Sequence, residues 1–316
     1  MSDLQKKIEK ARAERDDARK SRDKHKELAL KRGQERDHLA RENARLSEIV
    51  QSLNQHIADF AAAPPPPPAF TMVPPGNGWP SHIPPVYYSD HLAIWDKTIR
   101  FLDEPRFQRS YQLGMQSGHS LGMPGTVDLH IEWRVHVALW VAMQGARLEG
   151  DFVECGVNTG IMSLAICDYL DFNRLNKKFW LFDTYEGIPV EQMSAEERVI
   201  GREKFNQCYP DCFERTTANF SRWPGAMLVR GKVPDTLKDA PVECVSYLSI
   251  DMNIAEPEIA AITHFWPKLV SGAWVLLDDY GWDHHRPQAE AMDEFARSVG
   301  VPILSLPTGQ AIILKP

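Results

Sequence analysis

A run of residues that could bind a nucleotide lies between Phe152 and Gly160 and reads FVECGVNTG. Its apolar start predicts a buried strand, and the glycines after it predict a turn that leads into a helix. The next apolar run, residues 179–182, ends on the acid Asp183. A strand, a glycine-bearing turn, a helix and a second strand that ends in an acid are typical of a mononucleotide-binding unit, in which the acid binds ribose hydroxyls.

The glycine spacing indicates which nucleotide this unit would bind. A dinucleotide fingerprint has three glycines, because the pyrophosphate must approach bare backbone at a helix N-terminus. Only Gly156 and Gly160 are present here, and Glu154 beside the turn would repel a pyrophosphate. The same acid would attract the ammonium and sulfonium charges of S-adenosylmethionine. The turn therefore predicts a cationic cofactor, and the alternative is an ordinary strand-to-helix turn that binds nothing.

A second group of acids follows two later apolar runs. Residues 247–250 precede Asp251, and residues 273–277 precede the pair Asp278 and Asp279. In an open α/β sheet, ligands bind beyond the carboxyl ends of the strands, so adjacent strands would bring these carboxylates together. Oxygen ligands at that density suit Mg²⁺ or a similar divalent ion. The alternative is that the acids only cap the turns and the helix that follow them.

The two groups together indicate methyl transfer from S-adenosylmethionine to an oxygen that a metal holds. A hydroxyl is a poor nucleophile, so a base must take its proton. Asp251 is the first candidate, with His284 and His285 as reserves that could equally be surface loop residues. Tyr280 and Trp282 could stack on a ring of the substrate or simply pack their loop.

The elements that must position these residues alternate between strand and helix, which predicts an α/β fold with a mostly parallel sheet and helices on both faces. The expected strands cover residues 151–155, 178–183, 226–230, 244–251 and 272–278, and the expected helices cover residues 127–147, 160–171, 256–269 and 286–299. Residues 301–306 and 310–314, on either side of a Pro-Thr-Gly turn, predict a C-terminal antiparallel hairpin. The long connection 190–223 is polar and aromatic, and it is expected to be helical and to form a lid.

The residues before this α/β region predict an appendage. Residues 1–60 predict a helical coiled-coil arm, because apolar residues between Leu39 and Phe60 alternate at spacings of three and four, with Asn43 in a core position. We therefore expect a homo-oligomer, although the alternative for residues 1–38 is a solvated single helix or a partly disordered charged arm. Residues 61–88 are a Pro-rich linker, and residues 89–316 are the expected catalytic domain.

Composition excludes several classes of partner. The net charge of −7 disfavours nucleic acid as the main partner. No apolar run has the length of a membrane span, and the charged N-terminus lacks the apolar core of a signal peptide. We therefore expect a cytoplasmic protein.

Several strings resemble, in the same order, motifs of the macrocin O-methyltransferase family, whose members are bacterial enzymes that methylate sugar hydroxyls on macrolides, aminocoumarins and related glycosides. Besides FVECGVNTG, these strings are LFDTYEGIP at 181–189, RGKVPDTL at 230–237, LSIDMN at 248–253 and WPKLVSGAWVLLDDYG at 266–281. The resemblance covers about residues 90–316. It implies a Rossmann-like class I methyltransferase fold with a seven-stranded sheet, S-adenosylmethionine as the donor and a Mg²⁺ site.

The resemblance also implies roles for individual residues. Glu154, Gly156 and Gly160 would line the methionine end of the cofactor, Asp183 would bind ribose, Tyr185 and Glu186 would lie near the nucleoside, and Asp251, Asp278 and Asp279 would bind the metal, with Asp251 also the base. Catechol O-methyltransferases have a lysine three positions after the first metal ligand. This chain has Ile254 there, which disfavours a catechol-type mechanism.

The implied acceptor is a hydroxyl of a sugar or glycoconjugate. Residues 1–88 have no counterpart in the antibiotic enzymes, which favours a cell-surface polysaccharide or a large glycoconjugate. Two alternatives stay open: methylation of a non-sugar hydroxylated small molecule such as a phenolic, and a catalytically silent scaffold whose coiled coil is its function.

Overall fold

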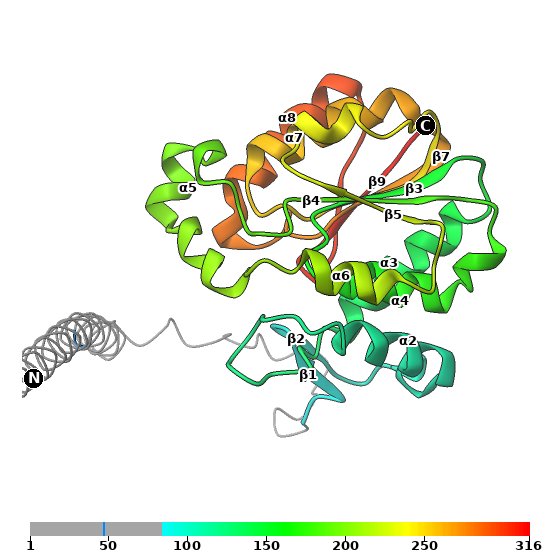
Figure 1. Ribbon diagram of the computed structural model, residues 1–316. Coiled ribbons are helices and arrows are strands. Elements are labelled where there is room, and N and C mark those ends of the chain that lie inside the picture. Colours follow the sequence, from blue (N-terminus) through cyan, green and yellow to red (C-terminus); the bar gives the residue numbers. More distant parts are fainter. Residues whose placement is uncertain (1–46, 48–83) are drawn as a thin grey trace, which may run out of the picture. The chain divides into compact units, whose positions relative to one another are not determined.

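The computed structural model describes Ser47 and residues 84–316 of the chain, and residues 82–316 form a compact unit separate from residues 1–81 (Figure 1). The predicted coiled-coil arm, apart from Ser47, and residues 61–83 of the predicted linker lie outside the described residues. Those two assignments stay predictions.

The described part of the chain is built around a seven-stranded sheet with the strand order β5-β4-β3-β6-β7-β9-β8. Its strands are β3 Asp151–Cys155, β4 Phe179–Asp183, β5 Ala226–Arg230, β6 Val245–Ile250, β7 Leu269–Leu277, β8 Leu304–Ser305 and β9 Ala311–Leu314. The strands from β5 to β7 run parallel, and β9 pairs antiparallel with both β7 and β8. The predicted Rossmann-like sheet and its C-terminal antiparallel hairpin are confirmed.

Helices cover both faces of this sheet (Figure 1). On one face lie α3 Glu132–Gly145, α4 Ile161–Tyr169 and α6 Phe213–Phe220, and on the other lie α7 Ala255–Phe265 and α8 Arg286–Val299. Successive strand residues point to opposite faces, so Phe152 joins the core under α3 and α4 whereas Val153 joins the core under α7. All six residues of β6 are buried, as expected for a central parallel strand.

Three features before β3 differ from the sequence-based expectations. Helix α2, Pro105–Met115, and the hairpin of β1 Tyr87–Ser89 and β2 Leu92–Ile94 were not predicted. Helix α3 begins at Glu132 rather than at residue 127, because His130 has a left-handed backbone with φ of 52° that no helix continues through.

The long connection from residue 190 to residue 223, here named the cover segment, is helical as predicted. It contains η3 Val190–Gln192, α5 Ala195–Ile200, η4 Arg202–Cys208 and α6. The other 3-10 helices of the described chain are η1 Arg100–Asp103, η2 Phe172–Arg174, η5 Asp235–Lys238, η6 Trp266–Lys268 and η7 Asp283–His285.

Two buried charged residues fasten the cover segment to the rest of the domain. Glu197 closes a capping box with Ser194 at the start of α5, and its Oε1 accepts a 2.7 Å hydrogen bond from the backbone N–H of Ala255 at the start of α7. Arg202 is fully buried, and its Nη2 donates to the backbone carbonyl of His284. The cover segment is therefore attached to the loops that follow both β6 and β7.

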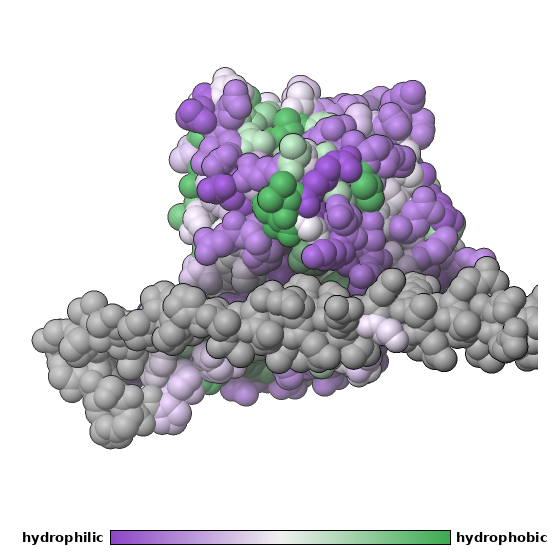
Figure 2. Space-filling view, turned by 90° about the vertical axis from the view of Figure 1, so that its left-hand side faces the viewer, coloured by the Kyte–Doolittle hydropathy of each residue, from purple (hydrophilic) through white to green (hydrophobic). Residues whose placement is uncertain are grey.

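The surface on the α5 side is mostly hydrophilic, with small separate hydrophobic patches (Figure 2). Helix α5 itself exposes Val199 and Ile200. Within the described residues, none of the helices combines the length and the apolar character that a crossing of a lipid bilayer requires.

Candidate active site

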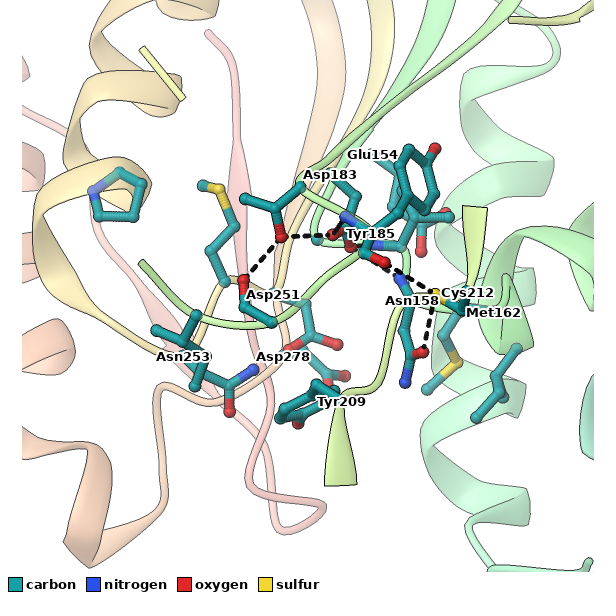
Figure 3. A pocket seen from close by; sticks show the side chains of 18 of the residues that line it. Glu154, Asn158, Met162, Asp183, Tyr185, Tyr209, Cys212, Asp251, Asn253 and Asp278 are labelled. Carbon is teal, nitrogen blue, oxygen red and sulfur yellow. Dashed lines mark hydrogen bonds between the residues drawn. The ribbon is translucent and has the colours of Figure 1, made fainter. Parts of the chain in front are cut away.

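One cleft at the carboxyl ends of the parallel strands contains both predicted groups of residues (Figure 3). It encloses about 1060 Å³ of empty space, counting its open mouth. The predicted residues that line it are Glu154, Gly156, Asp183, Tyr185, Asp251 and Asp278. Figure 3 shows Glu154 and Asp183 above Asp278 and Tyr209. The nucleotide-binding turn and the second acidic group thus share one space.

Gly156 brings the two groups into backbone contact. Its φ is 91°, and a Cβ placed on it would lie 1.8 Å from the backbone carbonyl oxygen of Asp251. Only glycine fits both the conformation and the close approach. Gly160 does not line the cleft. It instead begins α4 with a φ of 92°, and a Cβ there would lie 2.5 Å from the ring of Phe220.

Asp183 fixes the shape of the turn through its carboxylate. Its Oδ2 accepts hydrogen bonds from the backbone N–H groups of Val157 at 2.5 Å and Asn158 at 2.7 Å, and its Oδ1 accepts one from Tyr185 at 2.6 Å. The Thr184 hydroxyl also donates to Oδ1, at 3.3 Å. These hydrogen bonds use the roughly four acceptor positions of a carboxylate, so a ribose hydroxyl would have to replace one of them. The residue is therefore a part of the turn as well as a candidate ligand group.

The two residues expected near the nucleoside have different surroundings. Tyr185 is buried, its hydroxyl donates to the carbonyl of Leu181 at 2.9 Å, and its ring packs edge-on against Phe213. Glu186 is exposed, pairs with Arg230 at 3.3 Å and does not line the cleft. Neither side chain presents a free polar group to the cleft.

Glu154 is a buried acid whose Oε2 has no hydrogen-bond partner among the described residues. Burial raises its pKa well above the ordinary value, and the carboxylates of Asp251 and Asp183 raise the pKa further. The neutral form is therefore favoured when no charged ligand is nearby. A positively charged ligand would favour the carboxylate instead, because opposite charges attract strongly in a buried site.

The three predicted metal ligands are brought together. One carboxylate oxygen from each of Asp251, Asp278 and Asp279 lies within 4.8 Å of the other two. Burial, with the Asp279 carboxylate second, raises the pKa of Asp251 to about 7, whereas Arg134 opposes that rise. Asp278 lines the cleft, and Asp279 lies behind it.

The Oδ2 atoms of Asp278 and Asp279 are buried and accept no hydrogen bond from the described residues. Each of these oxygens lies beside a nitrogen group but forms no hydrogen bond with it. The Arg134 guanidinium lies beside Asp278, and Nδ1 of His285 lies 3.2 Å from Asp279. Three clustered carboxylates, two of which have an oxygen that accepts no hydrogen bond from the described residues, are a donor set that fits a hard divalent ion such as Mg²⁺.

A buried polar chain that the sequence did not predict connects the two acid-bearing loops. Glu258 Oε1 accepts hydrogen bonds from the backbone N–H of Met252 and from Gln288 Nε2, both at 3.1 Å, and Gln288 contacts His285 Nδ1. Burial raises the pKa of Glu258 to about 8. These hydrogen bonds fix the position of the loop after β6 relative to the loop after β7.

The reserve bases and the aromatic residues of the second loop are placed away from the reaction space. Burial lowers the pKa of His285 to about 4, which makes it a weak base, and His284 is exposed. The Tyr280 hydroxyl donates to Asp293 at 2.6 Å, and Trp282 packs edge-on against His91. None of these side chains lines the cleft, and both aromatic residues pack their loop.

Sequence reasoning missed the cations of the site. Arg134 and Arg202 come from α3 and the cover segment, and both lie near the acids of the second group. One signal was available, a charged residue on the apolar face of a predicted helix. Arg134 follows the buried Ile131 by three positions and precedes the buried Ala138 by four.

Comparison with known proteins gives consistent matches. The family profile described as macrocin O-methyltransferase (TylF) matches residues 136–305. The 8-demethyl-8-(2,3-dimethoxy-alpha-L-rhamnosyl)-tetracenomycin-C 4'-O-methyltransferase of Streptomyces olivaceus is 27% identical over 161 residues. The demethyldecarbamoylnovobiocin O-methyltransferase of Streptomyces niveus is 27% identical over 158 residues. Each match covers 48% of this chain and 60% of the relative, so the chain spans about 60% of the length of these relatives.

A solved structure shows the same fold. The O-methyltransferase NovP superposes with a TM-score of 0.51 at 22% sequence identity, over 58% of this chain and 79% of NovP. The matched family profile spans more than half of the sequence and includes β3, the acids at the ends of β6 and β7, and most of the helices around the cleft. The chain is therefore a member of the macrocin O-methyltransferase family.

Proposed function

We propose that the protein is an O-methyltransferase that uses S-adenosylmethionine and a divalent metal ion to methylate a hydroxyl of a sugar or glycoconjugate. One observation carries the proposal. The acid-bearing turn after β3 and the carboxylates of Asp251 and Asp278 line the same cleft, in a chain of an O-methyltransferase family.

The residues of the turn suit a cationic donor. Glu154 supplies a buried carboxylate with an unpartnered oxygen, which attracts the ammonium and sulfonium charges of S-adenosylmethionine. Gly156 leaves bare backbone beside it, and Asp183 holds the turn with a carboxylate that could exchange its long hydrogen bond from Thr184 for one from a ribose hydroxyl. S-adenosylmethionine supplies a methyl carbon that is electrophilic because it is bonded to a sulfonium.

The second acidic group suits the acceptor. Asp251, Asp278 and Asp279 would hold the divalent ion, which would supply positive charge that lowers the pKa of a nearby hydroxyl. Asp251 lines the cleft, and its carboxylate is the group there that could accept the proton of the acceptor hydroxyl. In the transfer, the acceptor oxygen forms a bond to the methyl carbon and the carbon–sulfur bond breaks. The hydroxyl proton moves to Asp251, and S-adenosylhomocysteine leaves.

The acceptor class rests on the relatives. The matched enzyme of Streptomyces olivaceus has a rhamnosyl group in its substrate name, and sugar hydroxyls are the acceptors that the family resemblance implies. A sugar-bearing acceptor is therefore proposed ahead of a phenolic one.

Calorimetric titration with S-adenosylmethionine, with and without Mg²⁺, tests the donor site. We expect saturable binding, and a complete lack of binding in both conditions would reject the enzyme in favour of a silent scaffold. Methyl transfer to a panel of nucleotide sugars, oligosaccharides and phenolics, with and without a chelator, then tests the acceptor class and the need for metal.

The substitution Asp251→Asn tests the proposed base. It removes the proton acceptor and one metal ligand, so we expect turnover to fall by about 10²–10⁴-fold while the affinity for S-adenosylmethionine stays within about threefold. Asp239→Asn, at an exposed position outside the cleft, is the matched control and should keep wild-type turnover. Undiminished turnover in Asp251→Asn would rule out both roles of this residue.

A further inference from the structure

A single basic side chain enters the acid-rich cleft. Among the described residues that line the cleft, Arg134 is the one basic residue, whereas Glu154, Asp183, Asp251 and Asp278 are all acids. Arg134 lies in the first turn of α3, and its guanidinium pairs with Asp278. The two side chains are 17% and 3% exposed, so water screens this pair only weakly.

The pairing uses a particular oxygen of Asp278. Its Oδ1 accepts a 2.8 Å hydrogen bond from Gln310 Nε2, whereas its Oδ2 faces the guanidinium and accepts no hydrogen bond from the described residues. Gln310 Nε2 also lies 3.4 Å from the backbone carbonyl of Arg134, so one amide fixes the carboxylate and the start of α3 together. Asp278 therefore has one oxygen held by the protein and one that only a cation approaches.

The same oxygen is the one that a metal ion would need. Asp278 belongs to the set of three carboxylates that lie within 4.8 Å of one another, and its Oδ1 is already committed to Gln310. A divalent ion and a guanidinium at one carboxylate oxygen would repel each other strongly at that distance. The Arg134 Nε is also buried without a hydrogen-bond partner in the described chain. The guanidinium also lies close enough to the carboxylates of Asp90 and Asp251 to lower the pKa of each, so it has other acids to interact with if it leaves Asp278.

We propose that Arg134 is an internal counter-ion that competes with the divalent metal for Asp278 and leaves this carboxylate when the metal binds. The inference rests on the metal site of the proposed function. Arg134 supplies positive charge to the acids when no metal is bound, and a bound metal ion would supply that charge instead. A permanent positioning role for Arg134 would have the opposite sign, because its removal would then weaken metal binding.

Binding of Mn²⁺ to the full chain, without S-adenosylmethionine and measured by electron paramagnetic resonance, tests the sign. We expect Arg134→Met to bind Mn²⁺ about tenfold more tightly than wild type, and Arg134→Lys to fall between the two. Arg230→Met is the matched control, because that arginine pairs with Glu186 and Asp211 on the exposed surface, and its Mn²⁺ affinity should not change. Equal or weaker Mn²⁺ binding by Arg134→Met would overturn the proposal.

Melting temperatures also distinguish competition with the metal from a permanent positioning role, and they require no measurement of activity. Without metal, Arg134→Met should melt at a lower temperature than wild type, and saturating Mn²⁺ should raise its melting temperature by more than it raises that of wild type. If Arg134→Met does not fold, Arg134→Lys and Arg134→Gln decide the sign.

The double variant with Asp278→Asn separates the two proposals. It should lose the gain in Mn²⁺ affinity, and a gain that persists would place the competition elsewhere and overturn the inference. If wild type and Arg134→Met both fail to bind Mn²⁺ while wild type transfers methyl in a chelator, the metal part of the function fails and the inference fails with it. Tighter Mn²⁺ binding in a protein that methylates no acceptor would support the inference and reject the function.

Discussion

Glu154 combines a stability cost with a binding role. Burial favours its protonated form, with a pKa well above the ordinary value of 4.5, so the folded protein holds a proton that the unfolded chain releases. Where the folded state binds more protons, stability falls as pH rises, by up to about 1.4 kcal/mol per pH unit for one group. This loss starts above the unfolded pKa and continues up to the folded pKa.

Replacing the acid should therefore remove that pH dependence. We expect the stability of Glu154→Gln, relative to wild type, to increase as the pH rises above the ordinary pKa of a glutamate, because the amide has no proton to lose. The affinity of the variant for S-adenosylmethionine should fall by about tenfold or more, because the buried opposite charge is gone. Urea denaturation at several pH values and calorimetry measure the two effects.

Glu214→Gln, at an exposed position on α6, is the control and should change neither quantity. Parallel stability profiles for Glu154→Gln and wild type across this pH range would show that Glu154 is ionised in the empty cleft.

At the scale of residues, the sequence identified the acids but not their partners. Glu154, Asp183, Asp251 and Asp278 could be found because each ends or follows an apolar strand, and parallel strands end at the same edge of a sheet. Arg134 does not follow a strand, and its position beside Asp278 depends on how α3 packs over β7. Only the three-dimensional structure brings it there.

At the scale of elements, the turn after β3 and the loop after β6 approach each other so closely at Gly156 that no side chain fits between them. Gly156→Ala adds a methyl group at a positive φ and against the Asp251 carbonyl, so we expect a loss of about 3 kcal/mol in stability and of most S-adenosylmethionine binding. Gly300→Ala separates the two causes. That glycine has a φ of 71° with nothing within 4 Å of its added Cβ, so it should lose only about 1 kcal/mol and keep binding.

Chemical denaturation of both variants gives the difference. Equal losses would show that the loop after β6 moves away to accept the methyl group, and that the two groups of site residues are less rigidly connected than their backbone contact indicates.

The elements that could be predicted are those that the sheet forces to be regular. Apolar runs predicted β3 to β6 to within a residue or two. For β3, β4 and β6 the reason is burial on both faces, which leaves little room for other residue types, whereas β5 is an edge strand without a buried residue. Helix α2 is mostly polar, and the large apolar residues on its buried side, Phe107, Tyr111 and Met115, recur only at every fourth position. These three residues pack in the core with α4. Such a short repeat is visible once the packing partner is known.

At the scale of the whole molecule, the arm and the catalytic domain are predicted to act separately. Because residues 82–316 form their own compact unit, deleting residues 1–60 should lower the oligomeric state and leave S-adenosylmethionine affinity within about threefold of wild type. Light scattering gives the mass of both proteins. An unchanged mass would count against the predicted coiled coil.

The attachment of the cover segment determines where an acceptor can enter. Opening it would expose the buried Glu197 and Arg202 and leave their partners at Ala255 and His284 without hydrogen bonds, which is costly. Another part of the cleft wall, around Leu121 and Leu129, is an irregular stretch between α2 and α3 with no comparable buried charge. A bulky glycoconjugate would therefore reach the reaction centre past this wall, and differences in acceptor size among related enzymes should appear in the length and composition of this stretch rather than in the helices over the acids.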